Sequence, residues 1–348
     1  MKTPPLRMIA WELTRRCNLS CIHCRALAAD EIDPNELTHE EAIELLNKVK
    51  DFASPVIILT GGEPMMREDI YEIAEYGTSL GFRMVMAPNG TLITPESVKK
   101  MKKAGIKRVS ISIDGPDSNS HDKFRGVKGA FDAAMRGISY LKEGGLPFQI
   151  NTTITKFNID QIDKILALAI SLGAVAHHIF LLVPTGRGME IKDQSISAQQ
   201  YEETLLWFYK QRQRYPIDFK ATCAPHYQRI IRQYGKGSST KTGGELARET
   251  RGCLAGIGFC FVSSTGVVQP CGYLEINCGN IREKPLEEIW RDSSVFNDLR
   301  DYDKLKGKCG ICEYRKVCGG CRARAYTMLG DYLAEEPFCT YQPYALNS

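Results

Sequence analysis

The chain has 348 residues, enough for one large domain and a smaller one. Apolar residues make up 43% and charged residues 25%, and no apolar stretch reaches the roughly 18 residues of a membrane span. The net charge is only +4, no basic run is interleaved with aromatics, and the N-terminus lacks the apolar core of a secretory signal. We therefore expect a cytoplasmic protein with a small anionic substrate, no nucleic-acid partner and no membrane span.

Apolar runs of strand length alternate with amphipathic helical stretches through the first half of the chain. Helix starts are marked by Thr38 and Glu41 in capping-box spacing and by Thr94 followed by Pro95. Six strands are predicted, at residues 9–14, 56–60, 83–87, 109–113, 148–153 and 178–182. This alternation predicts an α/β fold, a partial TIM-like barrel of six βα units.

Chemically suggestive residues follow the first four predicted strands. Cys17 follows the first, Gly61 the second, Asn89 the third and Asp114 the fourth. Because the carboxyl ends of parallel strands meet on one face, we expect the active site there.

The second half of the chain changes in composition. A helical pattern with Tyr201, Leu205 and Phe208 leads into YGKGSSTKTGGE, which is typical of a flexible surface loop. We predict a core at 1–215, a linker and cavity-flanking segment at 216–250, and a small cysteine-rich domain at 251–348. The last of these holds nine of the thirteen cysteines, and metal ligation explains so many thiols in a reducing compartment better than disulfides do.

The first cysteine cluster has the spacing C-x3-C-x2-C, at Cys17, Cys21 and Cys24. Three thiolates can hold three irons of a [4Fe-4S] cluster and leave the fourth iron open for a reactant. A zinc site with His23 as fourth ligand is the alternative. The spacing resembles the signature of the radical S-adenosylmethionine (SAM) superfamily, in which an aromatic residue precedes the last cysteine; here that residue is His23.

The GGEP segment after the second strand strengthens this resemblance. Its glycines permit close backbone approach, and its carboxylate can pair with the SAM ammonium group. The resemblance implies that a 5′-deoxyadenosyl radical is generated from SAM, and it implies these cofactor-binding residues: His23, Gly61, Gly62, Glu63, Pro64, Asn89, Ser112 and Arg125. For Asn89 and Ser112, ordinary polarity at a strand end is the alternative.

The C-terminal cysteine pattern resembles a SPASM domain, which implies one or two auxiliary [4Fe-4S] clusters. One implied ligand set is Cys253, Cys271 and Cys321, with Cys260 as a candidate fourth ligand. The other is Cys309, Cys312, Cys318 and Cys339. Two features depart from the family pattern: only two residues, both glycine, separate the cysteines at 318 and 321, and Cys260 is additional. Structural zinc is the alternative.

Two further cysteines fit neither set. Cys278 is expected to be an apolar filler of the core. Cys223 lies near the predicted domain junction, and its role stays open between packing and a functional site.

Four segments resemble, over nearly the whole chain, the radical SAM enzymes of the alternative haem pathway: AWELTRRCNLSCIHCRA, LLVPTGRG, KATCAPHYQRI and RGCLAGIGFCFV. This resemblance implies a tetrapyrrole substrate, iron-coproporphyrin III, two of whose propionates are oxidatively decarboxylated to vinyl groups to give haem b. It also implies an electron donor such as a flavodoxin or ferredoxin. The alternatives are another tetrapyrrole side-chain enzyme (sirohaem-derived or haem d1 pathway), a peptide-modifying SPASM maturase, and a non-enzymatic electron carrier.

A substrate with four carboxylates needs basic partners. Residues predicted to flank its cavity are Arg187, Lys220, Cys223, His226, Arg229, Arg232 and Arg251. His226, His177 and His178 are candidates to ligate the substrate iron or bind a propionate. For each cation a solvated surface position is the alternative, and for each histidine a structural one.

Overall fold

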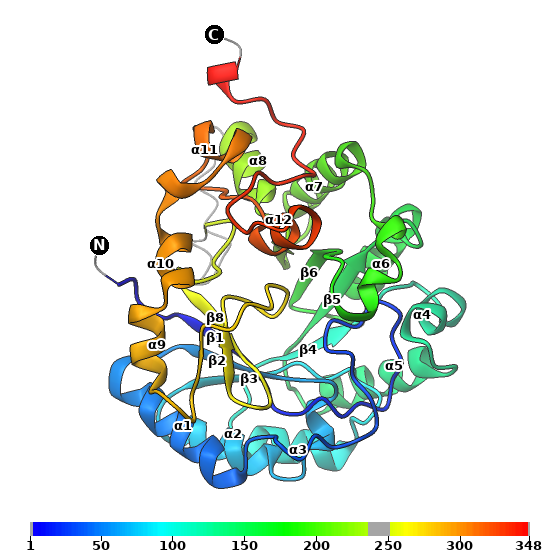
Figure 1. Cartoon of the computed structure of the whole chain (residues 1–348). Coiled ribbons are helices and arrows are strands. Elements are labelled where there is room, and N and C mark those ends of the chain that lie inside the picture. Colours follow the sequence, from blue (N-terminus) through cyan, green and yellow to red (C-terminus); the bar gives the residue numbers. More distant parts are fainter. Residues whose placement is uncertain (1–2, 236–250, 347–348) are drawn as a thin grey trace.

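The computed structural model describes residues 3–235 and 251–346 (Figure 1). Within them, one ten-stranded sheet has the order β10-β9-β8-β1-β2-β3-β4-β5-β6-β7. The strands are β1 (Met8–Glu12), β2 (Val56–Thr60), β3 (Arg83–Met86), β4 (Val109–Ser112), β5 (Phe148–Ile154), β6 (Ala176–Leu181), β7 (Asp218–Thr222), β8 (Phe259–Val262), β9 (Val267–Gln269) and β10 (Gly279–Asn280). The six predicted strands are therefore confirmed as β1 to β6, and they are all parallel.

Helices follow the strands as βα units require. Those of the first half are α1 (His39–Phe52), α2 (Ile70–Ser79), α3 (Pro95–Lys103), α4 (Ser118–Arg125), α5 (Ala130–Glu143) and α6 (Ile162–Leu172). Thr38 caps α1 in a capping box with Glu41, and Thr94 caps α3 with Pro95 in its first turn, as predicted. Figure 1 shows α1 to α5 on the outside of the curved sheet.

The second half adds further helices, most of which lie on the opposite side of Figure 1 from α1 to α3. They are α7 (Ala198–Arg212), α8 (His226–Tyr234), α9 (Leu286–Asp292), α10 (Ser294–Arg300), α11 (Gly307–Ile311) and α12 (Arg322–Leu329). From residue 236 onward, the Gly/Ser/Lys-rich segment predicted to be a loop lies outside the described residues.

Two strands join the sheet in ways that the alternation pattern does not predict. β7 comes from the segment predicted to be a linker, and it pairs in parallel with β6. β8 comes from the cysteine-rich segment, and it pairs in parallel with β1, placing Cys260 opposite Ile9. The C-terminal segment thus shares the sheet of the barrel, while the predicted domain division itself stays a prediction.

Packing against α7 identifies the outer face of β6. Ile179 and Leu181 of β6 pack with Leu205 and Phe208 of α7 in one apolar cluster. Because side chains alternate along a strand, the residues between them face the interior of the curved sheet. Among the described helices, none is long and apolar enough to cross a membrane.

Candidate active site and auxiliary cluster sites

The cysteines that follow β1 lie close together in one loop. Cys17 and Cys21 are buried, Cys24 is half-buried, and all three belong to one small cluster with Leu19. The Leu19 N–H donates to Cys17 Sγ at 3.4 Å, and the Cys24 N–H donates to the Cys21 carbonyl at 3.2 Å. Burial raises the pKa of Cys17 to about 11, and the neighbouring thiols add to this rise.

Arg125 reaches this loop from the end of α4. Its buried guanidinium donates to Cys21 Sγ at 3.6 Å and forms an ion pair with the buried carboxylate of Asp114. Burial raises the pKa of Cys21, and Arg125 beside it acts in the opposite direction, which favours the thiolate. The half-buried ring of His23 lies 4.3 Å from that of Phe124. His23 and Arg125 therefore both lie at the cysteine loop.

Gly61 and Gly62 pack against the backbone that leads into the cysteine loop. A Cβ atom on Gly61 would lie 2.4 Å from the Thr14 carbonyl oxygen, and one on Gly62 would lie 2.5 Å from those of Arg15 and Arg16. The Gly62 N–H donates to the Thr14 carbonyl at 2.8 Å. The close backbone approach predicted for these glycines is thus an approach to the protein's own cysteine loop.

Glu63 joins the ends of β2 and β3. Its fully buried carboxylate accepts hydrogen bonds from the backbone N–H groups of Met65 (2.9 Å) and Asn89 (2.6 Å). Burial raises the pKa of Glu63 to about 7. Pro64 opens the short 3-10 turn Pro64–Met66 that Glu63 caps. The Asn89 side chain donates to the Asn18 side chain at 2.8 Å, so the network ends at the cysteine loop.

Replacing Gly62 by Ala is expected to lower both iron content and reductive SAM cleavage. We expect cleavage to fall by about 10–100-fold, the usual effect of changing a residue that supports metal ligands without binding the metal. The added methyl group would meet two backbone carbonyls of the loop, which cannot move without shifting the cysteines. Gly258→Ala is the matched control, because its Cβ would have no heavy atom nearer than 3.7 Å. Unchanged cleavage in Gly62→Ala would show that the loop does not depend on this contact.

A row of polar residues crosses the interior face of the sheet. Ser112 of β4 lies opposite Asn151 of β5, which lies opposite His178 of β6, which lies opposite Lys220 of β7. All four are half-buried. His177 points the other way and is buried, with its ring 6.0 Å from that of Phe208. Asn151 was not predicted, although the polar alternation of Gln, Asn and Thr along β5 marks its face.

Four cysteines of the C-terminal segment line one cavity: Cys309, Cys312, Cys318 and Cys339. This cavity holds about 420 Å³ of empty space, including a part that is open to solvent. The backbone N–H groups of Glu336, Tyr314 and Gly320 donate to the first three sulfurs in chain order, at 3.4, 3.4 and 3.5 Å. Such hydrogen bonds stabilise ligand thiolates, so the predicted second set of cysteines fits a cluster.

His226 lines the same cavity from the start of α8. Its side chain is 1% exposed, and neither ring nitrogen has a hydrogen-bond partner among the described residues. Burial lowers the pKa of His226 to about 4, so the ring is neutral at pH 7. A buried ring with two unpaired nitrogens indicates that this cavity accommodates a polar group, as a cluster would be.

A second group of cysteines forms beside this cavity. Cys253, Cys271 and Cys321 belong to one apolar cluster, and Cys223 belongs to it as well. Cys260 lies elsewhere: on β8 it is fully buried in the main core, beside Cys278, which packs against that core as predicted. The structure thus brings together three of the four cysteines in the predicted first set and places Cys260 apart from them.

The double glycine at 319 and 320 separates these two groups. Both glycines have positive φ, +76° and +63°, which disfavours other residues. A Cβ on Gly320 would lie 2.2 Å from Arg322 Nη2 and 3.2 Å from Cys309 Sγ. The unusual two-residue spacing therefore makes a tight turn that sends Cys318 to the cavity and Cys321 to the other group.

Tyr273 and Arg25 lie between the loop of Cys24 and the group of Cys223 and Cys271. The Tyr273 hydroxyl is close enough to the side chains of Arg25, Cys24, Cys223 and Cys271 for their charges to affect its pKa. Arg25 donates to the buried carboxylate of Glu12 at 2.7 Å and to the Gly272 carbonyl at 3.4 Å. The two cysteine groups therefore approach each other from opposite ends of the chain.

Most of the basic residues predicted to bind the substrate instead contact other groups of the protein. Arg187 donates to the carbonyls of Cys21 (2.9 Å) and Ala28 (2.8 Å), and so secures the cysteine loop. Arg229 pairs with Glu202. Arg251 donates to the Arg315 carbonyl, with its guanidinium 3.9 Å from the ring centre of Tyr302.

A single zinc ion would bring its ligands close together, because Zn–S bonds of about 2.3 Å require it. No group of three or more His, Cys, Asp or Glu side chains within residues 3–235 and 251–346 converges in this way. A [4Fe-4S] cube binds each thiolate through a different iron and so holds the sulfurs farther apart.

Comparison with known proteins agrees with this arrangement. Residues 11–169 match the radical SAM superfamily, and residues 253–322 match SPASM, an iron-sulfur cluster-binding domain. An AdoMet-dependent heme synthase of Nitratidesulfovibrio vulgaris is 56% identical over 98% of this chain and 94% of its own length. The chain belongs to the radical SAM enzymes that carry a SPASM domain. An Fe-coproporphyrin III synthase of Methanosarcina barkeri is 35% identical over 95% of the chain and 87% of its own length.

Solved structures confirm the fold. The structure of Streptococcus suis SuiB bound to S-adenosylmethionine superposes with a TM-score of 0.74 at 21% identity, over 97% of this chain and 78% of that one. As a radical SAM enzyme, the chain uses SAM and [4Fe-4S] clusters, and a purely electron-carrying role is excluded. When bound at the Cys17, Cys21 and Cys24 loop, SAM and the cluster supply a carbon radical that removes hydrogen from unactivated carbon.

Proposed function

We propose that this enzyme of haem biosynthesis converts iron-coproporphyrin III to haem b by oxidatively decarboxylating two propionates. The observation that carries the proposal is similarity along nearly the whole chain: identity is 56% to an AdoMet-dependent heme synthase but 35% to an Fe-coproporphyrin III synthase. The proposal includes a cytoplasmic location and a flavodoxin or ferredoxin as electron donor.

The reaction balances in atoms and electrons. A hydrogen atom leaves the propionate β-carbon for the 5′-deoxyadenosyl radical, which becomes 5′-deoxyadenosine. The bond between the α-carbon and the carboxylate then breaks, carbon dioxide departs, and the vinyl double bond forms. One electron is released, for which the group at Cys253, Cys271 and Cys321 offers an acceptor site near the radical-generating loop.

The row of polar residues on the interior face of the sheet, at Ser112, Asn151, His178 and Lys220, supports an anionic substrate. Lys220 faces the interior of the sheet beside His178, and burial lowers its pKa. Among the described residues it has no ion-pair partner, unlike Arg229, whose charge Glu202 neutralises. A half-buried cation without an ion-pair partner among the described residues favours a carboxylate as ligand, and propionates supply one.

The test is anaerobic incubation of the reconstituted enzyme with iron-coproporphyrin III, SAM and dithionite. The substrate mass is expected to fall in two steps, each by one carbon dioxide and two hydrogens, with one 5′-deoxyadenosine formed per step. Parallel reactions contain a sirohaem-derived tetrapyrrole or no tetrapyrrole. The proposal fails if 5′-deoxyadenosine accumulates without these mass losses, or if only the sirohaem-derived compound is converted. Replacing dithionite by reduced flavodoxin or ferredoxin tests the donor.

A further inference from the structure

Cys223 occupies a turn whose backbone is unusual. It has φ of +55°, and besides Leu27 it is the only non-glycine residue in the described ranges with positive φ. A non-glycine side chain in this conformation is strained, and it persists only where the surroundings impose it. The turn joins β7 to α8 and therefore comes from outside the SPASM match.

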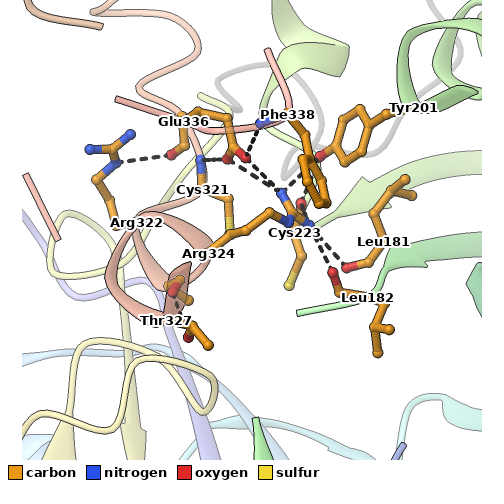
Figure 2. Close-up of polar contacts among 12 residues, drawn as sticks. Leu181, Leu182, Tyr201, Cys223, Cys321, Arg322, Arg324, Thr327, Glu336 and Phe338 are labelled. Carbon is orange, nitrogen blue, oxygen red and sulfur yellow. Dashed lines mark hydrogen bonds and ion pairs between the residues drawn. The ribbon is translucent and has the colours of Figure 1, made fainter. Parts of the chain in front are cut away.

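Two buried side chains impose this conformation (Figure 2). The Cys223 carbonyl accepts a hydrogen bond from Arg324 Nη2 at 2.9 Å and another from the Tyr201 hydroxyl at 2.8 Å. Arg324 is fully buried and Tyr201 is 1% exposed. Arg324 belongs to α12 and Tyr201 to α7, so two elements outside the turn hold its backbone.

This turn brings the Cys223 side chain to Cys253, Cys271 and Cys321, the predicted ligands of the first auxiliary cluster. Its thiol lies within hydrogen-bonding reach of the Cys321 thiol and close to Cys271, and Cys253 neighbours both of these SPASM cysteines. Apolar residues surround the four sulfurs, including Val183, Ala255 and Leu274. Four thiols from four separate segments thus belong to one cluster of mainly apolar residues, and four is the ligand number of a fully coordinated [4Fe-4S] cluster.

No other cysteine can complete the set. Cys260, the candidate fourth ligand in the sequence analysis, is held in β8 by its pairing opposite Ile9, and its thiol faces the main core. The cysteines at 309, 312, 318 and 339 line their own cavity. Arg324 lies beside Cys321 and Cys223, and its positive charge offsets part of the charge that four thiolates bring.

We propose that Cys223 is the fourth ligand of the first auxiliary [4Fe-4S] cluster, together with Cys253, Cys271 and Cys321. The cluster then has no open iron. It cannot bind the substrate directly, and its role is confined to electron transfer. This inference rests on the SPASM assignment and is independent of which tetrapyrrole the enzyme uses.

The test uses the full chain with Cys17, Cys21 and Cys24 replaced by Ala, so that only auxiliary clusters remain. In this parent, ¹³C-cyanide added to the dithionite-reduced protein should give no cyanide hyperfine coupling in the cluster EPR signal, since every iron has a cysteine. Cys223→Ala in the same background should either bind cyanide at an opened iron or lose about four irons per chain. Cys223→Ser should retain iron with an altered EPR spectrum.

Cys260→Ala is the matched control and should leave the iron content, EPR spectrum and cyanide response of the parent unchanged. Cys271→Ala should lose the cluster outright. Cyanide binding by the parent itself would overturn the proposal without any further variant, because it would reveal an open iron. A Cys223→Ala protein with the parent's spectrum, iron content and cyanide response would overturn it as well.

Discussion

Replacing Cys21 by Ala is expected to abolish reductive cleavage of SAM. Cys21 is buried in the loop after β1, and its sulfur receives the Arg125 guanidinium at 3.6 Å. Two remaining thiolates cannot hold a cube with one open iron, so the loss should exceed the roughly 10–100-fold typical of changes to residues that only support the ligands. The measurement is anaerobic formation of 5′-deoxyadenosine and methionine with dithionite as reductant.

Cys278→Ala is the control for this experiment, because that thiol packs against the main core beside Cys260. It should retain cleavage close to that of the unmodified enzyme. If Cys21→Ala cleaved SAM within tenfold of the Cys278→Ala rate, the assignment of the radical-generating cluster to this loop would be lost.

Replacing Arg324 by Met is expected to destabilise the enzyme by about 3–5 kcal/mol, the usual cost of removing one partner of a buried ion pair. Arg324 and Glu336 are both fully buried, with 3.2 Å between Nη1 and Oε1. The same guanidinium donates to the carbonyls of Leu181 and Leu182 at the end of β6, each at 3.2 Å (Figure 2). The substitution would leave the buried Glu336 carboxylate without its counter-charge and remove the arginine donor from the Leu181 and Leu182 carbonyls. Anaerobic urea unfolding, followed by tryptophan fluorescence, measures the change.

Two variants separate the ion pair from a general effect of losing an arginine. Arg291→Met removes an exposed arginine that pairs with its neighbour Asp292, and should change stability by less than about 0.5 kcal/mol. Combining Arg324→Met with Glu336→Gln removes the uncompensated charge and should restore part of the stability. An Arg324→Met enzyme with the unfolding midpoint of Arg291→Met would contradict the role assigned to this pair.

The strands that the pattern reveals are those with regular local signals. β2 is an apolar run, and β4 and β5 alternate apolar with polar residues. The helix caps at Thr38 and Thr94, which precede β2 and β4, form as their sequences predict. β7 was missed because DFKAT is short and lies with half-buried or exposed side chains on both faces. β8 is short as well, and its partner β1 lies about 250 residues away, a distance that no local pattern encodes.

Some residues of the candidate site could likewise be placed from the sequence, and others could not. The residues of the GGEP segment follow a strand end, and the structure places them at the cysteine loop as the order of the βα units requires. Arg187 and Arg229, by contrast, were expected near the substrate because of their charge. Their side chains are used by the protein, on the carbonyl of Cys21 and on Glu202, and only packing could decide that.

The cysteine groups show most clearly what each level determines. Spacing along the chain is sufficient to predict that Cys17, Cys21 and Cys24 bind one cluster. Successive cysteines in this short loop are only four and three residues apart, so their side chains must lie close together. The four cysteines that line the C-terminal cavity were grouped by the resemblance to SPASM domains, and the structure brings them together. Cys260 and Cys223 depend on tertiary structure: pairing of β8 with β1 turns one thiol into the core, and Arg324 and Tyr201 hold the turn that brings the other to Cys321. Sequence by itself determines such a site where the ligands are local, and the tertiary structure decides it where the ligand comes from a distant turn, because only packing fixes where that turn lies.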